Sequence, residues 1–255
     1  MVNLHRFANP NRFMRLSGFV LPWVSGIAAI TFVVRLYLAL VVSPPDYEQR
    51  ETVRIMYIHV PAAWMALFSY TLMAASSAAA LIWRHPLADI AAKSIAPVGA
   101  GFTFICLVTG SLWGQPTWGT WWVWDARLTS VLILFFLFVG YMVLFDAFDD
   151  PTKGARAAGV LAMVGFVFVP IIKFSVDILE LRTLHQGASV SKLSSPSIHE
   201  SMLWPLLIMA LAYIAYFISL LLVRMRSAIL AARVRSLRMM QAERASRVTI
   251  APERL

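Results

Sequence analysis

Six long apolar segments dominate the sequence and limit the folds open to this chain. They lie near residues 21–42, 58–83, 96–113, 130–148, 157–178 and 202–223. A helix needs about 20 apolar residues to cross the hydrocarbon core of a bilayer, and each segment meets that length. Of the 255 residues, 60% are hydrophobic and only 14% are charged, which excludes an ordinary soluble domain. We therefore predict an all-α integral membrane protein with six transmembrane helices in a single domain over residues 1–255.

The distribution of lysine and arginine predicts the orientation, because cytoplasmic segments beside transmembrane helices carry an excess of both residues. With the N-terminus inside, the cytoplasmic basic residues are Arg6, Arg12, Arg15, Arg84, Lys93, Lys153, Arg156 and those of the tail, residues 224–255. The outer basic residues are only Arg50, Arg54, Arg127, Arg182 and Lys192. Both termini are thus predicted to be cytoplasmic, with outer loops near residues 43–57, 113–129 and 179–201.

The formal net charge of +9 raises the question of nucleic-acid binding. Eight of the 22 lysines and arginines lie in the tail, which suits the anionic cytoplasmic leaflet. We therefore predict the lipid bilayer, and no nucleic acid, as their partner. Leu230, Val234 and Leu237 allow the tail to form a basic amphipathic helix on the membrane, or it serves simply as an anchor. The sequence has no Gly-x-x-x-x-Gly-Lys-Ser/Thr loop, so an ATP-driven step would need a partner.

The second outer loop is rich in tryptophan. It holds five of the nine tryptophans, namely Trp113, Trp118, Trp121, Trp122 and Trp124. Gly114, Pro116 and Gly119 are expected to end the third apolar helix. Trp118, Trp121, Trp122 and Asp125 are three and four residues apart, so they would lie on one face of a helix. This spacing predicts a short amphipathic helix in the outer interface. Such a shelf fits haem, a quinone or a lipid, and it also fits plain anchoring of helix ends, so its shape leaves these alternatives open.

Two of the five histidines are predicted to share the outer face with this shelf. His59 begins the second apolar segment, and His185 lies in the third outer loop. A single interfacial histidine is more often a surface residue than a ligand, but two beside an aromatic shelf favour a shared ligand. Neutral imidazole is a common axial ligand of haem iron, and two imidazoles would fill both axial positions. The pattern predicts non-covalently bound haem b with a bis-histidine iron.

Three charged residues near this face have two interpretations each. Arg54 and Arg127 can neutralise the haem propionates, or they can extend from helix ends toward water. Asp125 can belong to the haem site, or it can cap the N-terminus of the fourth helix.

The stretch from Trp113 to Ser130, WGQPTWGTWWVWDARLTS, resembles the tryptophan-rich signature of the haem exporter protein C family of bacterial cytochrome c maturation. The segments YIHVPAA at 57–63, AFDD at 147–150 and TLHQG at 183–187 agree with that family. The resemblance therefore covers nearly the whole chain.

This resemblance implies a function, partners and a location. In that family two outer histidines ligate haem, and the tryptophan loop presents it to a periplasmic haem chaperone. At the matching positions of this sequence, the resemblance implies that His59 and His185 are the haem ligands. It also implies that the loop from Trp113 to Arg127 presents the haem, with Trp113, Trp118, Trp121, Trp122, Trp124, Asp125 and Arg127. The implied partners are an ATP-binding cassette subunit with its permease and a small single-span subunit in the bacterial inner membrane. The resemblance implies haem handling rather than an enzyme.

Two other functions remain open at this stage. A permease would need a polar path, and small residues such as Gly99, Thr103 and Gly110 could line one or could serve close helix packing. A quinone-linked redox protein would use the shelf without needing both histidines. Lys173 is explained by an ion pair with Asp177, and His199 has no predicted role.

Overall fold

The structure, a computed structural model, describes residues 9–176, 185 and 198–250. Its α-helices are α1 (Pro10–Tyr37), α2 (Met56–Trp83), α3 (Pro86–Trp118), α4 (Ala126–Asp146), α5 (Pro151–Gly165), α6 (Phe168–Phe174) and α7 (Glu200–Ile250). A π-helical turn, Leu38–Val42, continues α1, and a 3-10 turn, Glu51–Ile55, leads into α2. This described part contains no β-strand, and 6 of its helical stretches are long and apolar enough to cross a membrane. The predicted all-α membrane protein with six transmembrane helices is confirmed.

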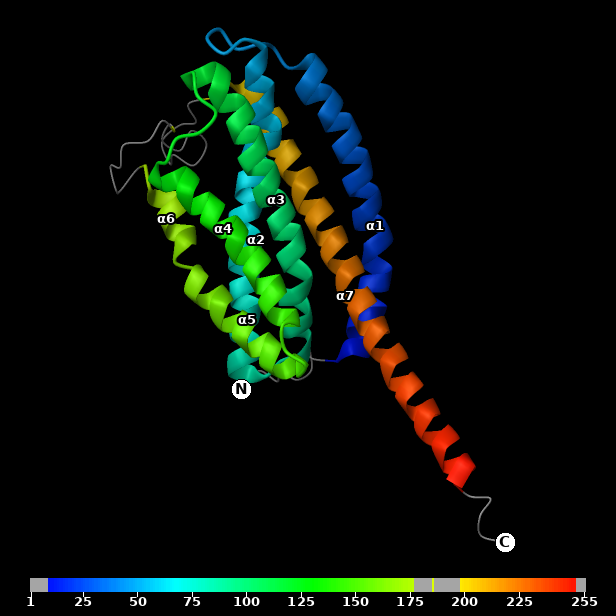
Figure 1. The fold of residues 1–255 in the computed structure, drawn as a ribbon. Helices are drawn as coiled ribbons and strands as arrows, with labels where there is room; N and C mark the ends of the chain where they lie inside the picture. Colours follow the sequence, from blue (N-terminus) through cyan, green and yellow to red (C-terminus); the bar gives the residue numbers. More distant parts are fainter. Residues whose placement is uncertain (1–8, 177–184, 186–197, 251–255) are drawn as a thin grey trace.

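The six long helical stretches run alternately up and down in one bundle, with α5 and α6 in the same direction (Figure 1). Residues 43–55 and 113–125 lie at one end, which we call the tryptophan end. The hairpins at 84–85 and 147–150 lie at the other end, which we call the tail end because α7 projects from it. The start of α1 and the end of α7 both lie at the tail end, as six crossings require.

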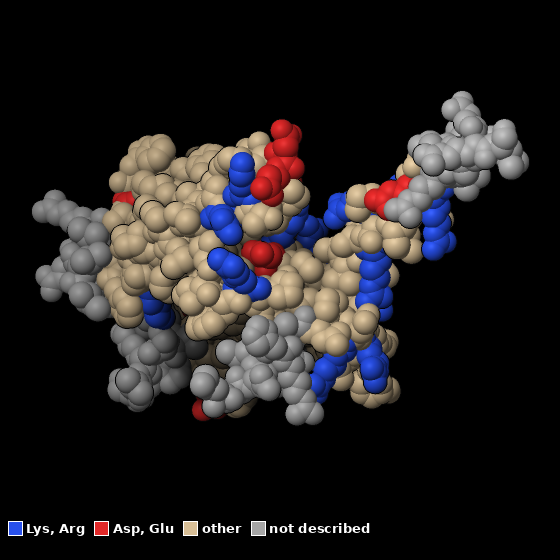
Figure 2. Space-filling model, turned by 90° about the horizontal axis from the view of Figure 1, so that it is seen from below, with Lys and Arg blue, Asp and Glu red and all other residues tan. Residues whose placement is uncertain are grey.

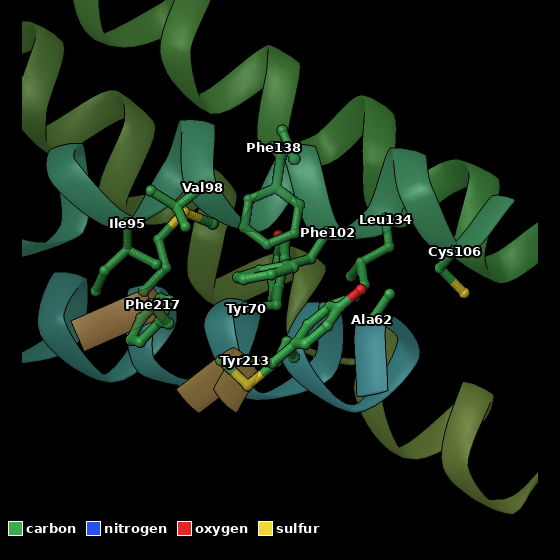
Figure 3. Close-up of a cluster of buried hydrophobic side chains, with 14 of the residues drawn as sticks. Ala62, Tyr70, Ile95, Val98, Phe102, Cys106, Leu134, Phe138, Tyr213 and Phe217 are labelled. Carbon is green, nitrogen blue, oxygen red and sulfur yellow. The ribbon is translucent and has the colours of Figure 1, made fainter. Parts of the chain in front are cut away.

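The core lies where α2, α3, α4 and α7 meet (Figure 3). The rings of Tyr70 and Phe138 meet edge to face, with centroids 5.0 Å apart. Phe102 packs against Tyr213 and Phe217, with ring centroids 5.6 and 6.5 Å away. These contacts tie α2 to α4 and α3 to α7, so the middle of the bundle is a firm base for residues at either end.

Small residues let α3 approach α2 and α4 closely. A Cβ atom at Gly99 would collide with the ring of Phe138 and would lie 3.0 Å from the Cβ atom of Ser69. Thr103 is buried, and its Oγ1 atom donates to the carbonyl of Gly99 at 2.7 Å. These positions serve helix packing, so they give no support to a permease path.

The tail-end hairpins are shorter than the sequence predicted, because α3 and α5 both begin with a proline. Pro86 and Pro151 occupy first-turn positions, where the missing N–H leaves no hydrogen bond unmade. Asp150 caps α5 by accepting from the backbone N–H of Thr152 at 2.8 Å. Arg84 ends α2 in the left-handed conformation, with φ 50°. Residues 84–95 and 149–156, which separate the predicted spans, are therefore largely helical.

The fifth predicted span, residues 157–178, is interrupted between α5 and α6. Pro170 has no N–H, and its ring conflicts with the carbonyl of Phe166 in a regular helix. That carbonyl instead accepts from the backbone N–H of Val169 at 3.0 Å, and the helix breaks at Phe166 and Val167. The predicted partner of Lys173, Asp177, lies outside the described residues.

The tail end is strongly basic. Viewed from that end, lysine and arginine gather on the bundle and along the projecting part of α7 (Figure 2). Arg226 on α7 donates to the carbonyl of Met14 at 2.6 Å and to Ser17 Oγ at 2.9 Å, which fastens α1 to α7. Lys93 pairs with Asp146 at 2.7 Å between α3 and α4. The basic tail continues α7 as one helix as far as Ile250.

The prediction of a separate amphipathic helix in the tryptophan loop is wrong. Instead, α3 continues through Gly114 and Pro116 to Trp118 and ends at Gly119, whose φ of 76° stops the helix. Residues 119–125 are not helical, and α4 begins after Asp125. Pro116 has no N–H to donate to the carbonyl of Leu112, yet the helix continues past it to Trp118.

Candidate haem site at the tryptophan end

Two histidines that are far apart in the sequence meet at the tryptophan end. The ring centroids of His59 on α2 and His185, between α6 and α7, lie 6.5 Å apart with an interplanar angle of 41°. Both side chains are partly buried. The structure therefore brings together the two residues that the sequence predicted as a pair.

His59 is held by α3 through its ring nitrogen Nδ1. This atom lies 3.1 Å from the carbonyl oxygen of Cys106 and 3.2 Å from Thr109 Oγ1. A carbonyl can only accept, so Nδ1 carries the proton and donates it. In the neutral ring, Nε2 then carries the lone pair that a metal would bind.

The close approach of α3 to His59 depends on a glycine. A Cβ atom at Gly110 would lie 3.0 Å from His59 Cε1 and 3.5 Å from Nδ1. The 3.0 Å spacing is tighter than nine in ten observed Cβ contacts, so a side chain here would press on the imidazole at Cε1. Of the small residues that the sequence offered for a permease path, Gly110 instead makes room for His59.

Two tryptophans from the end of α3 pack against the histidines. Trp113 meets His59 edge to face, with ring centroids 5.7 Å apart and an angle of 75°. Trp118 lies beside His185, with ring centroids 5.1 Å apart. Because both indoles lie on the helix that also holds His59 Nδ1, α3 organises both sides of the pair.

The surroundings of His185 keep its imidazole neutral. Burial lowers the pKa of His185 to about 4; the charges of Arg127 and His59 act in the same direction, and Asp125 opposes them. A neutral imidazole is the form that binds metals. These interactions also place Arg127 and Asp125 in the electrostatic surroundings of His185.

The two predicted arginines differ in their contacts. Arg127 donates through Nε to Ser175 Oγ at 3.1 Å, and it acts on His185 by charge. Arg54 pairs with Glu51 and donates to the carbonyl of Leu40 at the end of the first span. The described contacts thus link Arg127 to the histidine pair and link Arg54 to the base of the first loop.

The remaining residues of the loop divide into two groups. Asp125 is buried and caps α4, accepting from the backbone N–H of Leu128 at 2.7 Å. Trp122 and Trp124 meet edge to face at 5.6 Å. Trp121 and Trp124 are 59% and 75% exposed, so they face outward rather than toward the core. The loop therefore combines buried contacts with exposed indoles.

Sequence reasoning missed Gln49, Gly110 and the carbonyl of Cys106. The amide oxygen of Gln49 accepts from the indole N–H of Trp113 at 2.9 Å. A backbone carbonyl leaves no signal in the sequence, and an outer-loop glutamine looks like any polar surface residue. His199 has a structural role, because its Nδ1 accepts from the backbone N–H of Ser201 at 3.3 Å at the start of α7.

Known proteins resemble the chain over almost its full length. The sequence profile of the family described as heme exporter protein C matches residues 3–240. The chain belongs to the heme exporter protein C family. The resemblance that the tryptophan loop suggested is thereby confirmed, and the match includes both histidines.

Individual members of the heme exporter protein C family agree with the profile. The protein of that name from Bradyrhizobium diazoefficiens is 54% identical over 237 residues, which cover 93% of this chain and 89% of the relative. That from Haemophilus influenzae is 44% identical, covering 89% of this chain and 92% of the relative. That from Escherichia coli K12 is 43% identical, covering 89% and 91%. The chain and these relatives therefore match over most of each other's length.

Proposed function

We propose that this chain binds haem b at the tryptophan end through His59 and His185 and delivers it during cytochrome c maturation. The meeting of the two imidazoles beside Trp113 and Trp118 is the observation that carries this proposal. The relatives are named heme exporters, which supports haem as the cargo.

The geometry of the histidine pair fits a shared iron. Metal–imidazole bonds are about 2 Å long, so two imidazoles on opposite sides of one metal have ring centroids on the order of 6 Å apart. The observed separation is 6.5 Å. His59 presents an unprotonated Nε2, because its Nδ1 donates to Cys106. Haem would thus meet one imidazole fixed to α3 and one held among rings and charges.

The tryptophan end also offers hydrogen-bond donors for the haem propionates. Arg127 supplies a positive charge beside His185. The indole nitrogen of Trp122 is buried and has no hydrogen-bond partner among the described residues. A propionate can accept from both kinds of donor. Arg54 remains a candidate, although its described contacts are with Glu51 and Leu40.

Positive charge at the tail end supports the orientation. By the positive-inside rule, the basic tail end lies in the cytoplasm and the tryptophan end faces the periplasm of a bacterial inner membrane (Figure 2). Haem at the histidine pair would then be accessible to a periplasmic haem chaperone. We also propose an ATP-binding cassette subunit, its permease and a small single-span subunit as partners, and we assign the chain no catalytic role of its own.

Hemin titration of the purified protein tests haem binding. The wild type should give a six-coordinate low-spin spectrum. His59→Ala and His185→Ala should each weaken binding, and added imidazole should partly restore the spectrum by filling the vacated position. His199→Ala is the matched control, because His199 is exposed and caps α7. An unchanged spectrum in the His59→Ala/His185→Ala double variant would refute the ligand assignment.

Transfer to the chaperone tests presentation separately from binding. Trp121 and Trp124 are exposed, so Trp121→Ala and Trp124→Ala should reduce haem attached to a co-expressed chaperone more than haem retained on this protein. Trp118→Ala should lower both together, because Trp118 packs against His185. Transfer that falls only in proportion to retained haem in all three variants would remove the presenting role.

A further inference from the structure

A hydrogen bond between side chains joins the first loop at the tryptophan end to the haem site. Gln49 lies in that loop, and its amide accepts from the indole N–H of Trp113 at 2.9 Å. An indole N–H can only donate, so the facing atom must be the amide oxygen. Trp113 is therefore the donor of this hydrogen bond and Gln49 is the acceptor.

The loop holds Gln49 in place through its backbone. The N–H of Gln49 donates to the carboxylate of Asp46 at 2.8 Å. Its carbonyl accepts from the backbone N–H and the hydroxyl of Thr52 at 3.1 and 2.5 Å. Asp46 and Arg50 close the turn with two backbone hydrogen bonds of 3.1 and 2.9 Å. With both backbone groups engaged, only the side chain of Gln49 is free to reach α3.

Trp113 transmits this contact to His59. Its ring meets the imidazole edge to face at 5.7 Å, while Gly110 lies against the imidazole at Cε1 and Nδ1. Rotation of the imidazole is limited by both neighbours. The exposed indoles of Trp121 and Trp124 show that tryptophans at this end can also turn outward. A hydrogen bond that keeps Trp113 against His59 would thus fix the direction of Nε2.

We propose that Gln49 is a positioning residue, which orients His59 toward the iron by holding Trp113 against the imidazole. This proposal rests on haem binding by His59 and His185, and it adds a residue outside the helices to that site. Gln49 itself touches neither imidazole in the described contacts; it acts through Trp113.

The test uses variants that separate the acceptor from the shape of Gln49. Gln49→Met keeps an unbranched side chain of similar length but removes the acceptor, and Gln49→Glu keeps an acceptor oxygen. Glu48→Gln is the matched control, because Glu48 is the exposed neighbour in the same turn. Trp113→Phe removes the donor, so combining it with Gln49→Met gives a double-mutant cycle.

Two measurements test the hydrogen bond and its effect on haem binding separately. In haem-free protein labelled with 15N-tryptophan, the indole N–H resonance of Trp113, assigned with Trp113→Phe, should shift in Gln49→Met and stay close to its position in Gln49→Glu and Glu48→Gln. In hemin titrations, Gln49→Met should weaken binding roughly three- to tenfold and lower the low-spin fraction. In the Trp113→Phe background, Gln49→Met should have no further effect.

The outcomes are distinguishable. An indole resonance that Gln49→Met leaves unchanged would refute the contact. A shifted resonance with unchanged hemin affinity, or an equal loss of affinity in the Trp113→Phe background, would refute the positioning role. A wild-type protein that forms no bis-histidine complex would refute the proposed function and with it the role of Gln49, even though the resonance still reports the hydrogen bond.

Discussion

His59 and His185 have different surroundings, although we propose that they share one iron. His59 lies on α2, with Nδ1 donating to a carbonyl of α3 and the ring packed against Gly110 and Trp113. The ring of His185 lies beside the rings of Trp118 and His59 and within reach of the charges of Arg127 and Asp125. One imidazole is held by a helix backbone, and the described contacts of the other are with side chains.

The two kinds of contact should respond differently to substitution. A backbone contact between packed helices cannot adjust without moving the helices, whereas side-chain contacts can rearrange. Changes on the α2–α3 side should therefore abolish correct coordination, and each change around His185 should weaken haem binding only partly.

The largest effect is expected from Gly110→Val. The new Cβ atom would lie 3.0 Å from His59 Cε1, and the added methyl groups would displace the imidazole from Cys106. Loss of this supporting contact should weaken hemin binding by roughly 10- to 100-fold and remove the low-spin spectrum.

Gly101→Val is the matched control for that substitution. Gly101 lies on the same helix, and a Cβ atom there would meet nothing within 4 Å. Both variants place a β-branched residue in α3, so only contact with His59 distinguishes them. Equal hemin affinities in the two variants would show that α3 does not position His59.

A smaller effect is expected from Trp118→Ala on the side of His185. The indole lies 5.1 Å from the imidazole, and aromatic pairs contribute about 0.5–1.5 kcal/mol, so hemin binding should weaken roughly 2- to 12-fold. Trp118→Phe should retain much of that affinity. A loss greater than that of Gly110→Val would reverse the proposed ranking of the two sides.

The smallest effects separate the two arginines. Arg127→Gln should lower hemin affinity by up to about fivefold at low salt, since a partly exposed charge pair contributes on the order of 1 kcal/mol or less. Arg54→Gln should change affinity less, because Arg54 is engaged by Glu51 and Leu40. The low-spin spectrum should persist in both. Equal losses in the two variants would restore the symmetric role that the sequence suggested.

Much of the fold could be predicted because the bilayer sets the length of each helix. The six apolar segments became the six crossing stretches, although α1 begins at Pro10 and α3 reaches Trp118, beyond the predicted ends. Hydrophobicity marks what lies in the hydrocarbon core and does not mark where a helix stops. The break at Phe166 follows from Pro170, which a count of apolar residues ignores.

The site could be predicted only in part. The chemistry of imidazole and the spacing of the tryptophans indicated residues that the structure brings together, but the predicted interfacial helix was wrong because Pro116 was given too much weight against the capping glycine at 119. Spacing also could not separate Trp118, which packs against His185, from the exposed Trp121. The contacts of Gln49 and of the Cys106 carbonyl depend on tertiary packing, for which a single sequence has no pattern.

Pulsed electron paramagnetic resonance of ferric haem in protein labelled with 15N-histidine counts the imidazoles bound to the iron, so it examines the proposed histidine pair itself. We expect two coupled histidine nitrogens of directly bonded type in the wild type and in His199→Ala, and one in His59→Ala and in His185→Ala. Two such couplings that persist in either His59→Ala or His185→Ala would rule out this pair of ligands.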